Sequence, residues 1–410
     1  MRPARRALLV QAVQQAARWP AGLYVHIPYC SSVCPYCDFN VYPVRSRAEL
    51  ATMVRAILQE AAAWAQLLRG AAGGFSTVYL GGGTPSLLPP EDLRCLVEGL
   101  RELLPLEGAQ EWSLEANPGT LTPRRVQAWK QAGITRVSLG VQSFHQEELL
   151  RLGRQHGPRQ VQRSLKLLRE AGWQNVNLDL MFGLPGQRLR DWQASLEQAV
   201  ASGVPHVSVY GLTLHPGTPF YDRWKAGQLE VAGESAQARM YRRAVEVLRA
   251  AELYRYEVSN FCRPGWECRH HLNYWNCGEY LGLGPGAHSH WAGWRFANRR
   301  HPAVYRVAAA AGQPALTVAW AEQLTCQQQR DEFILLGLRL ARGVDRQEFY
   351  RRFGLWPEQA YDGRAWERMA ALGLVHLHRR NWWRLTDRGF LLADAVAREI
   401  LAAARQVVVP

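Results

Sequence analysis

The stretch from Leu23 to Asn40, L-Y-V-H-I-P-Y-C-S-S-V-C-P-Y-C-D-F-N, constrains this chain more than any other part of its sequence. An apolar, β-prone run leads into a loop that carries Cys30, Cys34 and Cys37 with the spacing C-x3-C-x2-C. Three thiols this close can face one point only if the loop wraps around a bound group. Thiolates are the usual ligands of iron–sulfur clusters. Three ligands would leave one iron of a four-iron cluster without a protein ligand. An open coordination position is typical of a functional site rather than a structural one.

Two other interpretations of the three cysteines stay open. Zinc sites usually show paired C-x2-C knuckles, and no second pair lies nearby. Disulfides suit a secreted chain, but three is an odd number and no secretion signal is recognisable. The spacing therefore favours a cluster.

The wider stretch from Tyr24 to Asn40 resembles the radical S-adenosylmethionine (SAM) superfamily, in which the three cysteines follow a strand and an aromatic residue, here Tyr36, precedes the last of them. Within that superfamily it resembles the oxygen-independent coproporphyrinogen III oxidases and their relatives, the haem chaperones of the HemW type. In the oxidases a fourth cysteine follows two residues after the third, and this chain has Phe39 there. That departure and the short run before Cys30 favour the chaperone branch.

Strand-like and helical runs alternate through the first half of the chain, which predicts a parallel sheet with helices outside. Right-handed crossovers would curl such a sheet into a barrel or an incomplete one. The strand candidates are Leu23–Ile27, Thr77–Leu80, Trp112–Ala116, Arg136–Val141, Val176–Phe182 and His206–Leu212, and the helical ones are Arg47–Leu68, Glu91–Leu103, Pro123–Gln131, Pro158–Ala171 and Leu189–Ala201.

The predicted fold class is therefore α/β: an incomplete (β/α)6 radical SAM barrel with a C-terminal, mostly helical, winged-helix-like domain. A chain of 410 residues is too long for one ordinary domain. We expect an N-terminal helical extension over 1–21, the barrel with its following H-x-L-N-Y-W segment over 22–305, and the C-terminal domain over 315–410. The Ala308–Pro314 stretch is interpreted as a linker, Val375–Thr386 as a hairpin and Asp387–Ala403 as a closing helix.

Polar and glycine-rich positions should gather at the carboxyl ends of the strands, where such folds place their chemistry. The glycines of G-G-G-T-P-S (81–86) expose backbone N–H groups to a ligand, although a plain turn would look the same. Glu115 ends the third predicted strand and Gln142 the fourth, while Asp179 lies inside the apolar fifth. A salt bridge is the alternative for Glu115, and Arg154 could be one more surface arginine or a clamp for a carboxylate.

The resemblance implies a role in SAM binding for these positions. Gly82, Gly83 and Thr84 match the glycine motif that holds the amino group of SAM. Glu115 matches the glutamate that contacts SAM in the family. The other positions that match the family pattern are Tyr24, Tyr36, Gln142, Arg154 and Asp179. The implied cofactors are a [4Fe–4S] cluster on Cys30, Cys34 and Cys37, SAM on its open iron, and haem.

A second segment, H-H-L-N-Y-W, resembles the chaperones' H-N-x-x-Y-W signature, with His271 in the place of the asparagine, and L-G-L-G-P-G-A-H-S matches the glycine loop that follows. This region is rich in residues that could ligate haem iron, but loop packing explains any one of them as well, and no haem ligand is assigned. They are Cys262, Cys268, His270, His271, Cys277, His288 and His290.

The formal charge of +14, carried almost wholly by arginine, indicates either a solvated basic surface or attraction to an anionic partner. The Arg-rich N-terminus is interpreted as a surface helix, although a transit peptide would look similar. Eight cysteines fit a reducing cytoplasm, and a location peripheral to the membrane is also open. The expected partners are haem and a haem-accepting respiratory protein, with a homodimer left open and no nucleic acid.

The resemblance implies one of two principal functions. The first is a haem chaperone that takes up haem and delivers it to a respiratory haem protein. The second is oxidative decarboxylation of coproporphyrinogen III, and a radical SAM enzyme with another substrate is a third possibility. Phe39 and the H-x-L-N-Y-W segment favour the chaperone.

Overall fold

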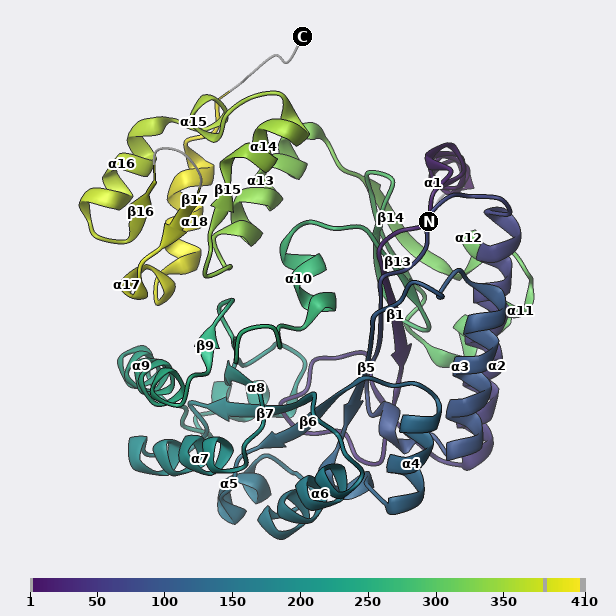
Figure 1. Ribbon diagram of the computed structural model, residues 1–410, viewed down its shortest axis with the longest axis horizontal. Coiled ribbons are helices and arrows are strands. Elements are labelled where there is room, and N and C mark those ends of the chain that lie inside the picture. The colour runs from purple at the N-terminus through teal and green to yellow at the C-terminus, as the bar shows by residue number, and fades with distance from the viewer. Residues whose placement is uncertain (1–2, 379–381, 406–410) are drawn as a thin grey trace. The chain divides into compact units, whose positions relative to one another are not determined.

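The computed structural model describes residues 3–378 and 382–405 (Figure 1). The chain divides into two compact units. The first holds Met1–Tyr254, Cys262–His270 and Glu279–Gln323, and the second holds Arg255–Phe261, His271–Gly278 and Leu324–Pro410. The chain therefore leaves the first unit and returns to it twice before the C-terminal residues begin.

Six parallel strands of the first unit coincide with the six predicted ones. They are β1 (Gly22–Ile27), β4 (Thr77–Gly82), β5 (Glu111–Ala116), β6 (Arg136–Gln142), β7 (Val176–Phe182) and β8 (His206–Gly211). They lie side by side in this order, each parallel to the next. The order does not return to β1, so the predicted incomplete barrel is confirmed.

Helices follow the strands and lie on the outer side of this sheet (Figure 1). They are α2 (Arg47–Leu67), α3 (Pro90–Leu103), α4 (Pro123–Gln131), α5 (Gln146–Arg151), α6 (Pro158–Glu170) and α7 (Leu189–Ala201). Their starts follow from capping: Ser46 accepts a hydrogen bond from the Glu49 N–H of α2, and Thr122 accepts one from the Arg125 N–H of α4. The face of α2 that meets the sheet buries Val54, Ile57, Ala61 and Trp64, among others.

Four further strands extend the sheet beyond β1, and the sequence analysis predicts none of them. In the order β1-β11-β12-β13-β14 they are β11 (Tyr280–Leu283), parallel to β1, and the antiparallel β12 (His288–Trp291), β13 (Trp294–Asn298) and β14 (Val318–Gln323). Their outer side packs on α2, where the ring of Trp64 lies 5.7 Å from that of Trp291 and 6.0 Å from that of Phe296.

The remaining elements of the first unit are short or peripheral. They are α1 (Pro3–Ala16), β2 (Tyr29–Cys30), β3 (Tyr42–Pro43), the 3-10 turns η1 (Pro85–Leu87) and η2 (Pro118–Thr120), α8 (Pro219–Lys225), α9 (Glu234–Ala250), α11 (Pro302–Ala310) and α12 (Pro314–Thr317). The expected linker Ala308–Pro314 thus ends α11 and begins α12. Three elements contain residues of both units, namely β9 (Tyr254–Arg255), β10 (Asn260–Cys262) and α10 (Arg269–Trp275).

The second unit combines helices with a small sheet. Its helices are α13 (Cys326–Gly337), α14 (Arg346–Phe353), α15 (Pro357–Ala360), α16 (Gly363–Ala371), α17 (Asp387–Phe390) and α18 (Ala393–Ala402). The strands β15 (Val344–Asp345), β17 (Trp382–Leu385) and β16 (Val375–Leu377) form one antiparallel sheet in that order. The hairpin of β16 and β17 agrees with the sequence, although part of its turn, 379–381, lies outside the described residues.

The predicted closing helix Asp387–Ala403 is wrong as a single element, because it is divided into α17 and α18. Thr386 caps α17 by accepting a hydrogen bond from the Gly389 N–H. This short helix packs so closely on the preceding chain that a Cβ on Gly389 would lie 2.0 Å from the carbonyl oxygen of Leu374. A new helix then starts after Leu392.

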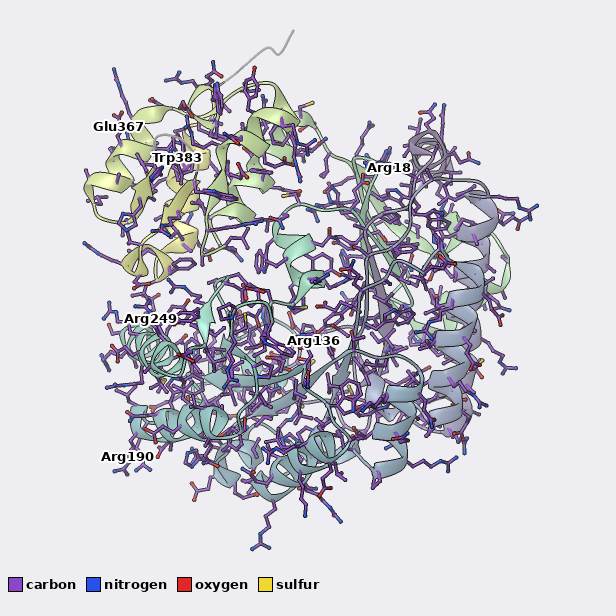
Figure 2. The ribbon with its side chains drawn as sticks, viewed as in Figure 1. Arg18, Arg136, Arg190, Arg249, Glu367 and Trp383 are labelled. Carbon is purple, nitrogen blue, oxygen red and sulfur yellow. The ribbon has the colours of Figure 1, made fainter. Side chains whose placement is uncertain are left out.

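Arginines occupy both the surface and the interior of the first unit. Figure 2 shows Arg190 and Arg249 at the outside of the ribbon and Arg136 within it. The side chain of Arg190 is 72% exposed, whereas Arg136 is fully buried. None of the helices in the described part of the chain combines the length and the hydrophobicity that a bilayer span requires.

Candidate functional site

The loop with the three cysteines connects β1 to α2 and is held by its own backbone. The short strands β2 and β3 pair in parallel. The Cys37 N–H donates to the carbonyl oxygen of Cys34 at 3.1 Å, and the Val44 N–H donates to that of Cys30 at 2.8 Å. All three cysteines are free and half-buried. The structure thus keeps the predicted ligands in one compact loop.

Two side chains from outside this loop reach its sulfur atoms. The hydroxyl of Thr84 lies 3.4 Å from the Cys30 Sγ, and the Arg154 Nη1 lies 3.6 Å from the Cys34 Sγ. Burial raises the pKa of Cys30, and it raises the pKa of Cys37 to about 11, with the neighbouring thiols adding to that effect. The Cys30 and Cys37 thiols are therefore protonated at neutral pH, and ligation of a metal would release their protons.

The chemistry of the three cysteines fits a four-iron cluster. Among residues 3–378 and 382–405 no group of three or more His, Cys, Asp or Glu side chains could hold a single metal ion. A four-iron cluster does not need such a group, because each of its irons binds a thiolate separately. Three free thiols in one loop, with a hydroxyl and a guanidinium donating toward sulfur, fit that requirement.

The glycine loop at the end of β4 lies directly against the cysteine loop. The Gly83 N–H donates to the carbonyl oxygen of Ile27 at 2.8 Å, and the Thr84 N–H donates to that of Tyr29 at 2.9 Å. A Cβ on Gly83 would lie 2.7 Å from the Tyr29 carbonyl oxygen. Gly82 has a φ of +111°, and a Cβ there would lie 2.6 Å from the ring of His26. Glycine is thus required for this close approach.

Glu115, at the end of β5, joins this loop to the inner face of the sheet. Its Oε2 accepts a hydrogen bond from the Gly82 N–H at 3.0 Å, and its Oε1 accepts one from the Tyr79 hydroxyl at 2.9 Å. The ring of Tyr24 stacks on that of Tyr79, and its hydroxyl lies 2.9 Å from the His26 Nδ1. Burial and the Glu115 charge raise the pKa values of Tyr24 and Tyr79, so both phenols stay protonated.

Tyr79 and His26 are site residues that the sequence analysis missed. Both lie on strands whose other residues are mostly apolar. His26 is two residues from the predicted Tyr24 on β1, and Tyr79 of β4 lies opposite Tyr24. Because side chains two apart on a strand share a face, alternation from Tyr24 is the signal that could have identified His26, whereas Tyr79 is placed by the pairing of β1 with β4.

Gln142 and Arg154 come together at the end of β6. A Cβ on Gly140 would lie 3.2 Å from the Gln142 Nε2 and 3.3 Å from the Arg154 Nη2, and that Nη2 donates to the Gly140 carbonyl oxygen at 2.7 Å. Gln142 has a φ of 68°, unusual for a residue other than glycine, and the strand register shifts between Leu139 and Gln142. The backbone is irregular where the predicted site residues converge, as is common at functional sites.

Asp179 lies on β7 within a separate polar network. Its carboxylate accepts a hydrogen bond from the Ser138 hydroxyl at 3.1 Å and one from the Asn177 amide at 2.8 Å. The Oδ1 of that Asn177 lies 2.6 Å from the His206 Nδ1. Burial raises the pKa of Asp179, an effect that the charge of Arg136 opposes. These partners all lie outside the predicted set of site residues.

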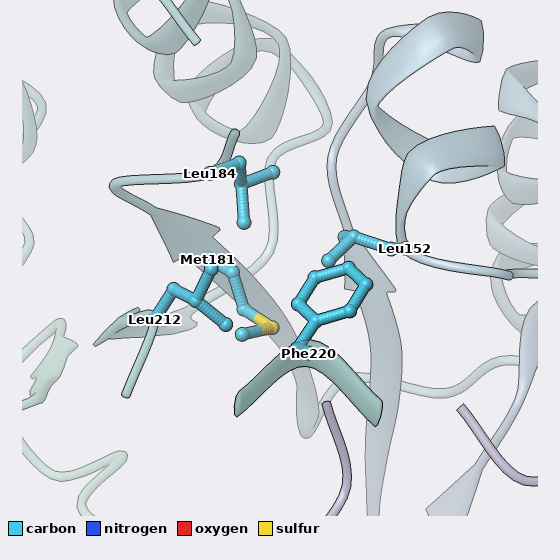
Figure 3. Packing of buried hydrophobic residues seen from close by; sticks show 5 residues of the cluster. All are labelled: Leu152, Met181, Leu184, Leu212 and Phe220. Carbon is cyan, nitrogen blue, oxygen red and sulfur yellow. The ribbon is translucent and has the colours of Figure 1, made fainter. Parts of the chain in front are cut away.

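Tyr36 anchors the second half of the cysteine loop. Its ring lies 6.1 Å from that of Phe220 and packs against a buried apolar cluster drawn from β7, α8 and the adjoining loops (Figure 3). The Phe220 N–H donates to the carbonyl oxygen of Pro35 at 2.9 Å. The cluster consists of Leu152, Met181, Leu184, Leu212 and Phe220.

The candidate haem ligands differ in burial. Cys262, Cys268 and His270 are buried, His271, Cys277 and His290 are half-buried, and His288 is exposed. His270 Nδ1 lies 2.8 Å from the Thr77 hydroxyl, and its ring stacks on Tyr79 at 5.2 Å. His270 is thus tied to the same inner face that carries Glu115.

Comparisons with known proteins agree with this architecture. The model of the radical SAM superfamily matches residues 24–199, and that of the HemN C-terminal domain matches residues 324–392. The chain is 34% identical to the heme chaperone HemW of Bacillus subtilis over 380 residues, covering 91% of this chain and 97% of the relative. It is 38% identical to the heme chaperone HemW of Mycobacterium tuberculosis over 387 residues, covering 93% and 95%.

A solved structure supports the fold alone. Coproporphyrinogen III oxidase (HemN) from Escherichia coli, a radical SAM enzyme, superposes with a TM-score of 0.83 at 22% identity, covering 96% of this chain and 93% of that one. The identity to the heme chaperones runs over almost their whole length, so the chain belongs to the HemW family of radical SAM proteins.

Proposed function

We propose that this protein is a haem chaperone that binds haem, a [4Fe–4S] cluster and SAM, and that it delivers haem to a respiratory haem protein in the cytoplasm or at the membrane surface. The observation that carries the proposal is the junction of the cysteine loop with the glycine loop. Free thiols, donors directed at sulfur, and the Glu115 carboxylate at the glycine loop lie together there. The names of the relatives support haem as the cargo.

Cys30, Cys34 and Cys37 would hold the cluster, and SAM would occupy the coordination position that they leave open. When bound, these groups supply an electron and a cleavable carbon–sulfur bond, and the protein's part is to bind and orient them. The hydroxyl of Thr84 and the guanidinium of Arg154 already lie at cysteine sulfur atoms. Both would stabilise the negative charge that thiolates bring into a half-buried loop.

The SAM contacts proposed here divide by charge. Glu115 is the carboxylate nearest the glycine loop and would pair with the cationic amino group, beside the backbone of Gly82, Gly83 and Thr84. Arg154 and Gln142 offer donors at the end of β6 for the carboxylate of SAM. Asp179 would accept from the ribose hydroxyls. Tyr24 would line the SAM site on the inner face of the sheet, where it stacks on Tyr79. Tyr36 would support the cysteine loop from its other side, where it packs on Phe220.

The position of the oxidases' fourth cysteine bears on the choice between chaperone and oxidase. Phe39 stands there and is 66% exposed. An exposed phenyl ring cannot ligate iron, but it offers apolar surface to a tetrapyrrole beside the cluster. This supports haem binding without adding a ligand to the cluster.

The experiment that tests the proposal is anaerobic reconstitution of the full chain with iron and sulfide. One portion is titrated with haem and followed by absorbance. A second is incubated with coproporphyrinogen III, SAM and a reductant, and assayed for decarboxylated product. Haem binding near one equivalent without decarboxylation is the expected result. Turnover to protoporphyrinogen would instead assign the oxidase activity, and the absence of haem binding would refute the chaperone.

A further inference from the structure

A row of three side chains crosses the strands β12, β13 and β14 on one face. The register places His288 opposite Ala297 and Ala297 opposite Trp320. Residues opposite each other in antiparallel strands share a face, so an imidazole, a methyl group and an indole lie in line. His288 is exposed, and Trp320 is 43% exposed. A metal ligand and an aromatic surface are thus separated by one small residue.

This row lies on the inner side of the sheet, the side that carries the candidate site. Tyr280 of β11 is opposite His290 of β12, and Gly282 lies beside Tyr24 of β1. Because side chains alternate along a strand, His288 and His290 face the same side as Tyr24. The outer side of the same strands is already filled by the packing of Trp291 and Phe296 on α2.

The row borders the end of the cysteine loop through His26 and Asn40. Burial lowers the pKa of His26 to about 4, and the nearby His288 adds to this effect. The His26 Nε2 lies 2.9 Å from the carbonyl oxygen of Asn40. The Asn40 amide in turn donates to the carbonyl oxygen of Pro285, at 2.9 Å, in the loop that precedes β12. A ligand on the row would therefore lie beside the cluster loop.

Two arginines, Arg295 and Arg300, bring positive charge close to His288. The pKa of His288 is lowered by burial of part of its ring and by the charges of Arg295 and Arg300. Glu322 is opposite Arg295 in the sheet and offsets part of its charge. Arg300 is exposed, and its Nε donates to the amide oxygen of Asn40 at 3.3 Å rather than to a carboxylate. Its charge is available to a carboxylate of a ligand.

We propose that this row is the surface on which haem binds, with His288 as the axial ligand, Ala297 and Trp320 under the macrocycle, and Arg300 paired with a propionate. The inference rests on the proposed function only in taking haem as the ligand. Three adjacent strands place the backbones of His288 and Trp320 about 10 Å apart, so a macrocycle whose iron is bound by His288 would extend across Ala297 toward Trp320. Imidazole is a common axial ligand of haem iron.

The test uses the full-length, cluster-loaded protein and two probes, haem and metal-free protoporphyrin. His288→Ala should weaken haem binding roughly 10- to 100-fold, as when a metal site loses a supporting group, and should shift the Soret band. Added imidazole should restore the wild-type spectrum. Protoporphyrin affinity should not change in His288→Ala, whereas Trp320→Ala should weaken both probes. His290→Ala, two residues away on the same face, is the matched control.

The outcomes separate this inference from the proposed function. A wild-type protein that binds no haem contradicts the proposed function. A His288→Ala variant with the wild-type haem affinity and Soret band overturns the row as the binding surface. Labelling of histidines by diethyl pyrocarbonate needs no variant: haem should protect His288 but not His376, which is exposed on β16 of the second unit. Equal labelling of His288 with and without haem would also overturn the inference.

Discussion

At the scale of single residues, the three cysteines can be tested most directly. Cys30→Ala, Cys34→Ala or Cys37→Ala should each remove the brown colour of the anaerobically purified protein, because the remaining two thiolates cannot retain a four-iron cluster. Iron and sulfide analysis gives the measurement. Cys95→Ala, at an exposed thiol on α3, is the matched control and should keep full cluster content. Wild-type iron and sulfide in any of the three loop variants would refute the ligand assignment.

Arg154 allows a separation of SAM binding from cluster binding. Its Nη2 is directed at the end of β6, and its Nη1 at the Cys34 sulfur. Arg154→Ala should weaken SAM binding about ten- to hundredfold, the usual range for losing a hydrogen bond to a charged group. The cluster should stay, because its ligands are thiolates. Calorimetry with SAM, together with iron analysis, measures both, and the exposed Arg159→Ala serves as control. Unchanged SAM affinity would count against the role.

Glu60 on α2 shows how one buried carboxylate joins distant parts of the first unit. It accepts hydrogen bonds from the Gly284 N–H at 2.9 Å, the Asn298 amide at 2.7 Å and the Thr317 hydroxyl at 2.8 Å, and it also accepts from the Tyr305 hydroxyl. Burial raises its pKa above the usual 4.5, although these donors oppose the effect. A charge inside a buried network of this kind makes stability depend on pH.

The sign of that dependence follows from the raised pKa. The folded protein binds the Glu60 proton more tightly than the unfolded chain does, so this contribution to stability is complete below the unfolded pKa and is lost as pH rises through the folded pKa. The free energy of unfolding of wild type, relative to Glu60→Gln, should therefore fall as pH increases above about 4.5. Chemical denaturation across that range is the measurement. A stability difference between wild type and Glu60→Gln that stays constant across this range would contradict the prediction.

At the level of single elements, the N-terminus of α10 is capped by a residue that is distant in the sequence. Cys268 precedes it, where a helix usually has Ser, Thr, Asp or Asn. Glu111 of β5 fills that role instead: its Oε2 accepts from the Arg269 N–H at 2.9 Å and its Oε1 from the His270 N–H at 3.1 Å. A carboxylate at a helix N-terminus also complements the helix dipole. The strand thus holds the beginning of the H-H-L-N-Y-W segment.

Glu111→Ala should therefore loosen the first turn of α10. Each charge-assisted bond contributes about 1.5–3 kcal/mol, so protection of the Arg269 and His270 amides against hydrogen exchange should fall about tenfold or more. Gln110→Ala, which removes only a contact to the Arg269 side chain, is the control and should leave these amides protected. Unaltered exchange in Glu111→Ala would show that α10 is held by other contacts.

These elements also show what the sequence can and cannot predict. The six parallel strands were predictable because each is an apolar run between helices, and the cysteine and glycine loops because their spacing is distinctive. The strands β11 to β14 were not, since they pair with β1 and with one another rather than following a strand–helix repeat. The Glu111 cap and Tyr79 depend on contacts between residues far apart in the chain, which local patterns do not encode.

At the scale of the whole molecule, the second unit is assembled from separate pieces of the chain. Residues 255–261 and 271–278 belong to it together with the C-terminal residues from 324 onward. The Ala341 N–H donates to the carbonyl oxygen of Tyr256 at 2.9 Å, and Arg342 donates to the amide oxygen of Asn276. The second unit therefore includes 271–278, and the residue that follows the H-H-L-N-Y-W segment is bonded to the C-terminal residues.

Arg255 allows a test of how the separate pieces of the second unit are held together. Its side chain is only 9% exposed, its Nη2 donates to the Asp387 Oδ1 at 2.6 Å, and its guanidinium lies 3.6 Å from the centre of the Phe390 ring. Asp387 is 61% exposed, so the ion pair contributes little and the ring contact more. Arg255→Ala should destabilise the unit by about 1–2 kcal/mol, whereas Arg255→Lys keeps the charge and should cost less.

Hydrogen exchange gives the measurement for Arg255, because it reports each segment separately. Arg255→Ala should speed exchange in 255–261 and 387–392 together, since one contact joins them. It should leave the amides of β5 and β6 unchanged, because those strands belong to the first unit. Faster exchange confined to 387–392 would mean that 255–261 is held by the neighbouring strands instead.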